Sequence, residues 1–147
     1  MTVVAWDGRT LAADKRACNG TLIHTTTKIF RVGGALAAYS GPAAAGEELL
    51  AWFRDGAVPA ELPESQRDDE RGGKLLVIDA TGIRVYEGTP YPLRFEGPHF
   101  AIGCGRDFAM AAMYLGKTAA EAVAVACALD SGCGNGIDTL ELTPCPS

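Results

Sequence analysis

The sequence predicts an α+β fold in which strands joined as hairpins are followed by helices. The dipeptide Asp7-Gly8 separates two apolar runs, and residues 74–87 read as two further strands around a turn. Two helical patterns then follow each other after residue 105. A chain of 147 residues is large enough to bury a substantial core, and we expect residues 1–147 to form a single domain.

The first hairpin occupies the N-terminus. Asp-Gly between apolar runs is a strong short-range hairpin signal, because both central turn positions favour a positive φ. The strand Thr2–Trp6 is therefore expected to pair with a second strand that ends at residues 13–16.

The next segment is rich in β-branched residues. After a turn at Asn19-Gly20 these residues continue to Gly33, and β-branched residues favour strands. If the run is extended, residues of one parity face one way, so Thr26 and Lys28 share a face. Residues 34–40 predict a buried strand.

A helix is predicted to start near Pro42, a residue favoured in the first turn, and to stop at Asp55-Gly56. Residues 57–73 are polar and predict a loop or a short exposed helix. The helix side chains expected in the core are Leu49, Leu50 and Phe53.

The C-terminal half alternates turns, short strands and helices. Residues 88–98 contain three prolines and predict irregular structure before a strand at 99–102. A helix follows the turn at residues 103–105 and closes at Gly116. A second helix opens with Thr118 and Glu121, which form a capping-box pattern. The remaining elements are a turn at 131–136 and a final strand at 137–143.

Composition excludes several classes of function. The net charge is −5 without a basic run, which argues against nucleic acid as a partner. The apolar stretch Ala122–Leu129 falls far short of the roughly 20 residues that span a bilayer, so no membrane association is expected. No secretory signal is visible, and five irregularly spaced cysteines without a metal-type pair favour reduced thiols in the cytoplasm. His24 and His99 stand apart from any ligand cluster.

The residues around Thr2 indicate a chemistry. Removal of Met1 would give Thr2 a free α-amine, whose ordinary pKa of about 7.7 to 8.0 suits it to take the proton of its own hydroxyl during attack. The Lys28 ammonium would lower the pKa of that amine, and Asp14 would supply the counter-charge that a half-buried lysine needs. If Met1 stays attached, the amine is an amide and the base is lost.

Each of these residues also fits an ordinary structural role. A Thr after Met1 is commonly just a permissive second residue, Asp14 fits a solvated strand end, and Lys28 fits a surface position. The hypothesis of a nucleophile rests on their combination.

The sequence Gly8–Ala17, together with Gly20, Ile23 and residues 27–30, resembles the N-terminal part of proteasome β-subunits and of HslV-type peptidases. The resemblance continues through Ser40-Gly41, Ala101–Gly105 and Asp130–Gly134, and so covers nearly the whole chain. It implies an N-terminal nucleophile hydrolase, which is a four-layer αββα sandwich assembled into rings around an inner chamber.

The resemblance also implies roles for individual residues. Thr2 would be nucleophile and base, Asp14 and Lys28 the charged pair, and Gly41 the backbone NH donor to the oxyanion. Cys104 and Cys133 stand where the family has serines near the amine, and a thiol is a weaker donor and acceptor than a hydroxyl. The other residues that it places at or near the site are Asp130 at the position of an Asp that supports the site, Arg16 at the family's arginine position, Ala17 and Thr26 in the substrate pocket, and Pro42 where many relatives have Gly. Thr26 equally fits a solvent face. Tyr39 is a further substrate-pocket candidate, with a core tyrosine as the alternative.

The function expected from these residues is that of a threonine-type endopeptidase in a homo-oligomeric ring, acting on peptides or unfolded proteins. A ring ATPase that unfolds substrates is the partner that the resemblance implies. No cofactor and no metal ligand are predicted. Two alternatives stay open: a non-catalytic ring or scaffold subunit, and an N-terminal nucleophile amidase that acts on small amides.

Overall fold

The computed structural model describes residues 1–142. The chain folds into two compact units, the first made of residues 1–30 with residues from 97 onward, and the second of residues 31–96. The single domain expected over residues 1–147 stays a prediction. Thr143, the expected end of the last strand, and Cys145 lie outside the described residues.

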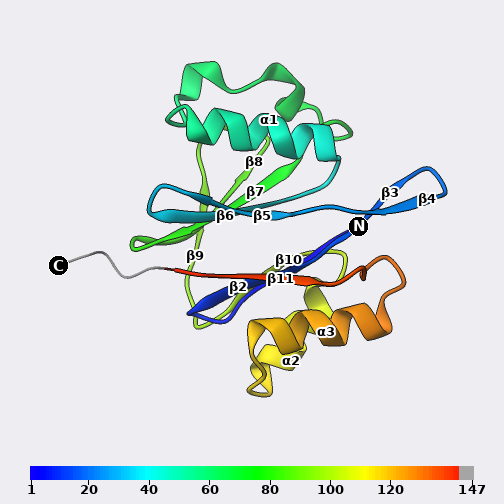
Figure 1. The fold of residues 1–147 in the computed structure, drawn as a ribbon. Helices are drawn as coiled ribbons and strands as arrows, with labels where there is room; N and C mark the ends of the chain where they lie inside the picture. The colour runs from blue at the N-terminus through cyan, green and yellow to red at the C-terminus, as the bar shows by residue number, and fades with distance from the viewer. Residues whose placement is uncertain (143–147) are drawn as a thin grey trace. The chain divides into compact units, whose positions relative to one another are not determined.

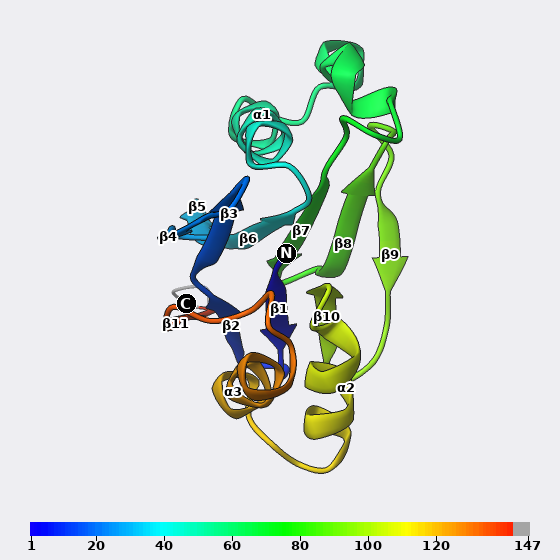
Figure 2. The same cartoon turned by 90° about the vertical axis from the view of Figure 1, so that its right-hand side faces the viewer.

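The first unit is built on an antiparallel four-stranded sheet in the order β10-β1-β2-β11, whose strands are all labelled in Figure 2. The bounds of its strands are β1 Val3–Trp6, β2 Thr10–Asp14, β10 Phe100–Gly103 and β11 Ile137–Glu141. The predicted N-terminal hairpin is confirmed, since Val4 pairs with Ala13 and Trp6 with Leu11. Strand β1 is central in this sheet, so the residue in front of it, Thr2, is held by partners on both sides.

The turn between β1 and β2 differs from the expected one. Only Gly8 has a positive φ, +97°, and the prediction of a positive φ at Asp7 is wrong. Instead the Asp7 carboxylate closes a longer loop, in which its Oδ1 accepts the NH groups of Arg9 at 3.0 Å and Thr10 at 2.8 Å. Its Oδ2 accepts the NH of Ala119 at 2.8 Å and so ties the hairpin to a helix.

Two helices, α2 Arg106–Tyr114 and α3 Ala119–Leu129, cover one face of this sheet. They lie together against it in both views (Figures 1 and 2). The predicted capping box is confirmed: Thr118 Oγ1 accepts the NH of Glu121 at 3.2 Å, and the Glu121 carboxylate accepts the NH of Thr118 at 3.1 Å. Small side chains on α3 pack on the strands, and the core members from α3 are Ala119, Ala122, Val123 and Ala126.

A separate hairpin, β3 Arg16–Asn19 with β4 Leu22–Thr25, turns at Gly20, where φ is +61°. The next strand, β5 Ile29–Val32, begins only after Lys28. Residues 26–28 are therefore not part of a strand. The strand alternation expected to place Thr26 and Lys28 on one face does not apply there.

The second unit contains a five-stranded sheet in the order β5-β6-β7-β8-β9. The predicted buried strand is β6 Ala35–Ser40, and the predicted second hairpin is β7 Lys74–Asp79 with β8 Gly82–Glu87. The expectation of irregular structure over residues 88–98 is wrong at β9 Leu93–Phe95, because this short edge strand pairs with β8.

Helix α1, Ala43–Arg54, packs on β6 and β7. Leu49 and Leu50 are buried as expected, but Trp52 occupies the core position predicted for Phe53, which is half-buried. Trp52 Nε1 donates to the carbonyl of Val58 at 2.8 Å, and this bond fixes the ring. After α1 come two single-turn 3₁₀ helices, Pro59–Glu61 and Glu64–Arg67. No helix among residues 1–142 is long and apolar enough to cross a membrane.

Candidate active site in the first unit

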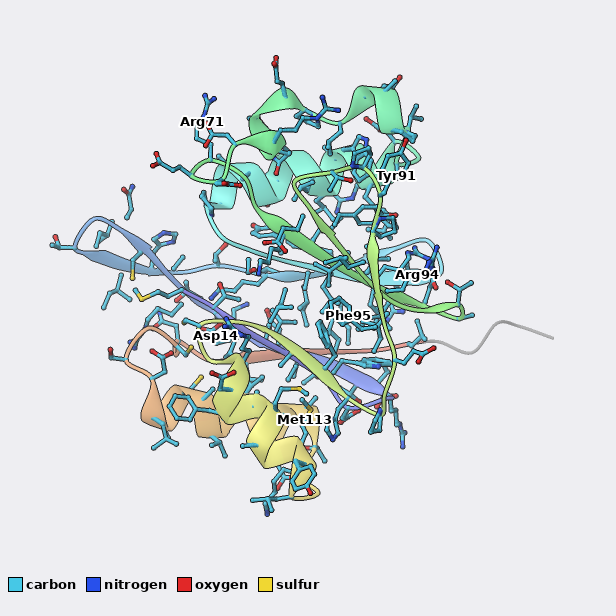
Figure 3. All side chains as sticks on the ribbon, turned by 180° about the vertical axis from the view of Figure 1, so that it is seen from behind. Asp14, Arg71, Tyr91, Arg94, Phe95 and Met113 are labelled. Carbon is cyan, nitrogen blue, oxygen red and sulfur yellow. The ribbon has the colours of Figure 1, made fainter. Side chains whose placement is uncertain are left out.

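A buried ion pair forms the centre of the candidate site. Lys28 Nζ lies 2.7 Å from Asp14 Oδ1, with side chains only 4% and 0% exposed. Asp14, labelled in Figure 3, ends β2 beside the start of β1. Its oxygens accept three backbone NH groups as well, from Val3 at 3.1 Å, Gly134 at 3.1 Å and Arg16 at 3.3 Å. A carboxylate with four donors is a satisfied buried anion, which makes its burial tolerable.

The ammonium of Lys28 also faces the N-terminal peptide. Its Nζ donates to the carbonyl oxygen of Met1 at 3.1 Å, directly before the nitrogen of Thr2. Thr2 itself is buried, with 6% of its surface exposed. The three residues predicted as nucleophile and charged pair therefore gather at one place in the first unit.

Thr2 is held from its other side by the turn that follows β10. The backbone NH of Thr2 donates to Cys104 Sγ at 3.3 Å, and the NH of Gly105 donates to the carbonyl of Thr2 at 3.2 Å. Gly103 has φ +96°, and a Cβ there would overlap the Thr2 carbonyl group. Only glycine lets this turn approach the candidate nucleophile so closely.

The turn after α3 brings Asp130 and Cys133 to the same place. Cys133 Sγ lies 3.8 Å from Cys104 Sγ, and a carboxylate oxygen of Asp130 lies within 4.8 Å of both sulfur atoms. Two hydrogen bonds brace the turn: Gly132 NH donates to Asp130 Oδ1 at 2.8 Å, and Cys133 NH donates to the Asp130 carbonyl at 3.1 Å. Burial, together with the neighbouring Cys104, raises the pKa of the Cys133 thiol far above its ordinary value.

Arg16 locks the same turn to strand β3. Its guanidinium donates to the carbonyl of Ser131 at 2.6 Å and to Asn135 Oδ1 at 3.1 Å. A Cβ on Gly134 would meet that guanidinium at 2.8 Å, so a larger residue there would displace the Arg16 side chain. Sequence reasoning gave no role to Gly103, Gly134 or Asn135. The repeated glycines of residues 103–105 and 132–136 were the available signal.

The two residues predicted for the substrate pocket in this unit are half-buried. Ala17 lies in β3 opposite His24, and the NH of Thr26 donates to the carbonyl of Lys15 at 2.8 Å. Both belong to the segment that connects Asp14 to Lys28, so they lie near the ion pair in sequence.

The remaining candidates, Gly41 and Tyr39, belong to the second unit. Gly41 follows β6 with φ +96° and borders a pocket of about 190 Å³, which is also lined by Gln66 and Gly73. Tyr39 is buried, and its hydroxyl donates to Glu47 at 2.9 Å. Burial and the Glu47 carboxylate raise the pKa of Tyr39 to about 12. These contacts favour the core role for Tyr39.

Comparisons with solved structures identify the class of fold. Thiobacillus denitrificans BPH in complex with epoxomicin matches with a TM-score of 0.74 and 21% identity over 98% of this chain and 100% of that chain. A second Thiobacillus denitrificans BPH structure matches with a TM-score of 0.69 and 22% identity over the same shares of the two chains, 98% and 100%. No protein-family model matches the chain, and no curated protein matches it by sequence.

HslV from Trypanosoma brucei is also similar, with a TM-score of 0.70 and 19% identity over 95% of this chain and 97% of that chain. The chain has the fold of the HslV and proteasome type, an α+β fold of the N-terminal nucleophile hydrolases. The predicted fold class is confirmed. Helices α2 and α3 pack on the four-stranded sheet of the first unit, and α1 packs on the five-stranded sheet of the second.

Proposed function

We propose that this chain, once Met1 has been removed, is a threonine-type endopeptidase. The nucleophile is the Thr2 hydroxyl, and the base is the α-amine of the same residue. The fold shared with HslV and BPH supports a peptidase, and the residues assembled around Thr2 support this particular chemistry.

The observation that carries the proposal is the buried ammonium of Lys28 beside the first peptide bond. It lies 2.7 Å from Asp14 Oδ1 and 3.1 Å from the Met1 carbonyl oxygen. A buried ion pair is weak support for stability, because desolvation offsets much of its attraction. A cation fixed next to a threonine that gains an amine is instead suited to keep that amine neutral and basic.

The reaction would proceed in two steps. The Thr2 amine takes the hydroxyl proton while Oγ1 attacks the peptide carbonyl, and the protonated amine then delivers its proton to the departing amine. An ester acyl-enzyme results, which a water activated by the same Thr2 amine hydrolyses. We assign the oxyanion to the Gly41 NH, a type of donor worth about 3 kcal/mol when well placed. Pro42 has no NH to add.

The test combines intact mass with a covalent probe. We would express the chain in cells and measure the loss of Met1. The protein would then be incubated with epoxomicin, an epoxyketone that is bound in the Thiobacillus denitrificans structure, or with a β-lactone that reacts with N-terminal threonine. One adduct per chain, absent in Thr2→Ala, is the expected result. Protein made with methionine aminopeptidase inhibited should take no probe, and peptide turnover by that form would refute the mechanism.

The second candidate is a non-catalytic ring subunit of the same fold. It is favoured by Cys104 and Cys133, since a thiol positions the Thr2 amine more weakly than a hydroxyl. A free Thr2 that takes no probe would favour this alternative. For either candidate we propose a homo-oligomeric ring in the cytoplasm with a ring ATPase as partner, and the mass of the native assembly tests the ring. A small-amide amidase does not require one.

A further inference from the structure

The strongest unassigned feature is a group of metal-binding side chains beside Thr2. Cys104 and Cys133 are 29 residues apart in sequence, and so no metal-type spacing is visible there. The fold brings their sulfur atoms to 3.8 Å, with a carboxylate oxygen of Asp130 within 4.8 Å of both. We propose that Cys104, Cys133 and Asp130 bind one Zn²⁺ ion per chain, and that the free Thr2 amine is its fourth ligand.

The distance between the sulfur atoms fits a tetrahedral zinc site. Zinc lies at about 2.3 Å from a cysteine sulfur, so two thiolates in tetrahedral geometry stand about 3.8 Å apart. The observed separation is 3.8 Å, so the two thiolates bind without moving. The Asp130 carboxylate, within 4.8 Å, moves inward by about 1 Å at most to complete the third bond.

The fourth ligand is the nitrogen of Thr2. It lies 3.3 Å from Cys104 Sγ. A zinc ion bound to one sulfur and one nitrogen separates them by about 3.6 Å, close to this value. The nitrogen is an amide while Met1 is attached, and an amide does not bind zinc as an amine does. The complete site therefore exists only in protein that has lost Met1.

The surroundings favour a preformed and accessible site. Hydrogen bonds within the Asp130–Cys133 turn and from Gly105 NH to the Thr2 carbonyl fix the two loops that carry the ligands. Cys104 is exposed, which gives the ion an access path, whereas Cys133 is 2% exposed and excludes water behind the metal. Each thiol loses its proton to solvent as its Zn–S bond forms, so binding releases two protons.

Occupation of this site would hold the Thr2 amine as a metal ligand. The lone pair that takes the hydroxyl proton would then be engaged, and a peptidase of the proposed kind would be blocked reversibly. This consequence rests on the proposed function, whereas zinc binding itself does not.

The experiment measures zinc affinity without any peptide substrate. The full chain carries Cys18→Ser and Cys145→Ser, so that thiols outside the cluster do not compete, and a phosphine keeps the thiols reduced. Competition with a chromophoric zinc chelator gives the stoichiometry and the affinity. Co²⁺ in place of Zn²⁺ gives a thiolate-to-metal charge-transfer band in the near ultraviolet that reports sulfur ligands directly.

We expect one Zn²⁺ per chain and a thiolate band with Co²⁺. Replacing outer partners of metal sites costs about 10- to 100-fold in affinity, so loss of a thiolate in Cys104→Ser should cost at least about 100-fold. Cys133→Ala should do the same, and Asp130→Asn and retained Met1 should each cost at least about 10-fold. Cys127→Ala is the matched control, a half-buried thiol of the same unit outside the cluster, and it should leave the affinity unchanged.

Three results would overturn the proposal. These are absence of zinc binding by the mature chain, an affinity unaffected by Cys104→Ser, and a Co²⁺ complex without the thiolate band. If Cys133→Ala does not fold, the Cys104→Ser variant, at an exposed position, and the Co²⁺ spectrum still test whether the cluster binds zinc. Failure of the metal site can be distinguished from failure of the proposed peptidase, because zinc affinity is measured without peptide turnover. An inactive chain that binds zinc refutes only the peptidase, and an active chain that binds none refutes only the metal site.

Discussion

Lys28→Met probes the buried pair of Asp14 and Lys28 most directly. Removing one partner of a buried pair costs about 3 to 5 kcal/mol, because the other charge stays buried. In Lys28→Met the Asp14 carboxylate keeps the NH groups of Val3, Arg16 and Gly134, so we expect about 3 kcal/mol. A chain of this size loses about 2 to 4 °C in Tm per kcal/mol, so Tm should fall by about 6 to 12 °C.

Asp14→Ala should cost more. In protein that retains Met1, it leaves the Lys28 ammonium with the Met1 carbonyl as acceptor, and it deprives three backbone NH groups of their acceptor, each worth about 1 to 3 kcal/mol when left unsatisfied. We therefore expect more than about 5 kcal/mol. Adding Lys28→Met to Asp14→Ala should then cost little or restore stability, because it removes the unpaired charge.

The assay is urea denaturation at fixed chain concentration, which yields the midpoint and the slope for each variant. Lys15→Met is the matched control. Lys15 Nζ is also 2.7 Å from its partner, Asp138, but the two side chains are 22% and 33% exposed, so at most about 1 kcal/mol is expected. The reasoning is refuted if Lys28→Met costs the same in the wild-type and Asp14→Ala backgrounds, or no more than the control.

Two further perturbations test the turns that hold Thr2 and the first hairpin. Gly103→Ala should destabilise the chain more than Gly116→Ala in thermal unfolding, because both positions have φ near +95° but only at Gly103 would the new Cβ overlap the Thr2 carbonyl; equal losses would contradict this. Asp7→Ala should cost about 1 to 2 kcal/mol, since three NH groups lose their acceptor. Partial burial raises the pKa of Asp7, but the hydrogen bonds from Ala119, Thr10 and Arg9 outweigh it and leave that pKa lowered. The stability that Asp7 contributes is therefore present above its unfolded pKa of about 3.9 and is lost as pH falls through the folded pKa. The free energy of unfolding of the wild type should then exceed that of Asp7→Ala at neutral pH, and the difference should vanish in acid. A difference that grows in acid would refute the assignment.

Local patterns predicted most of the strands because their signals act over a few residues. The Asp-Gly turn and the apolar runs beside it predicted β1 and β2, and β7 has the bounds that its apolar run and the turn at residue 80 indicated. Strand β9 escaped prediction because only pairing with the edge of β8 makes its three residues a strand. Prolines are tolerated around such an edge.

Neighbouring helix positions were harder to separate. Trp52 and Phe53 are three and four residues after Leu49, so both lie near the apolar face of α1. The choice between them depends on the Val58 carbonyl, which accepts a bond from the Trp52 indole. That acceptor lies beyond the helix, and the hydrophobic pattern of the helix carries no information about it.

The sequence motif predicted which residues form the centre of the candidate site. Thr2, Asp14 and Lys28 all lie within the first 28 residues, and the motif named them together without giving their geometry. The glycines that shape the site could not be predicted in this way. The Thr2 carbonyl approaches Gly103 and the Arg16 guanidinium approaches Gly134, and a sequence shows a glycine without showing its neighbour.

Cys104 takes part in both proposals, as a hydrogen-bond partner of the Thr2 nitrogen and as a zinc ligand. Its sulfur is 3.3 Å from the Thr2 nitrogen, where a hydroxyl would bond more strongly. If the chain is a peptidase, Cys104→Ser in zinc-free buffer should raise kcat about 2- to 10-fold, the effect of about 0.5 to 1.4 kcal/mol in one hydrogen bond. The same variant should remove inhibition by zinc. Cys18→Ser, in the exposed β3–β4 hairpin, should change neither quantity. A fall in kcat for Cys104→Ser would mean that the thiol itself serves the amine, and the departure from the family would then be an adaptation for catalysis.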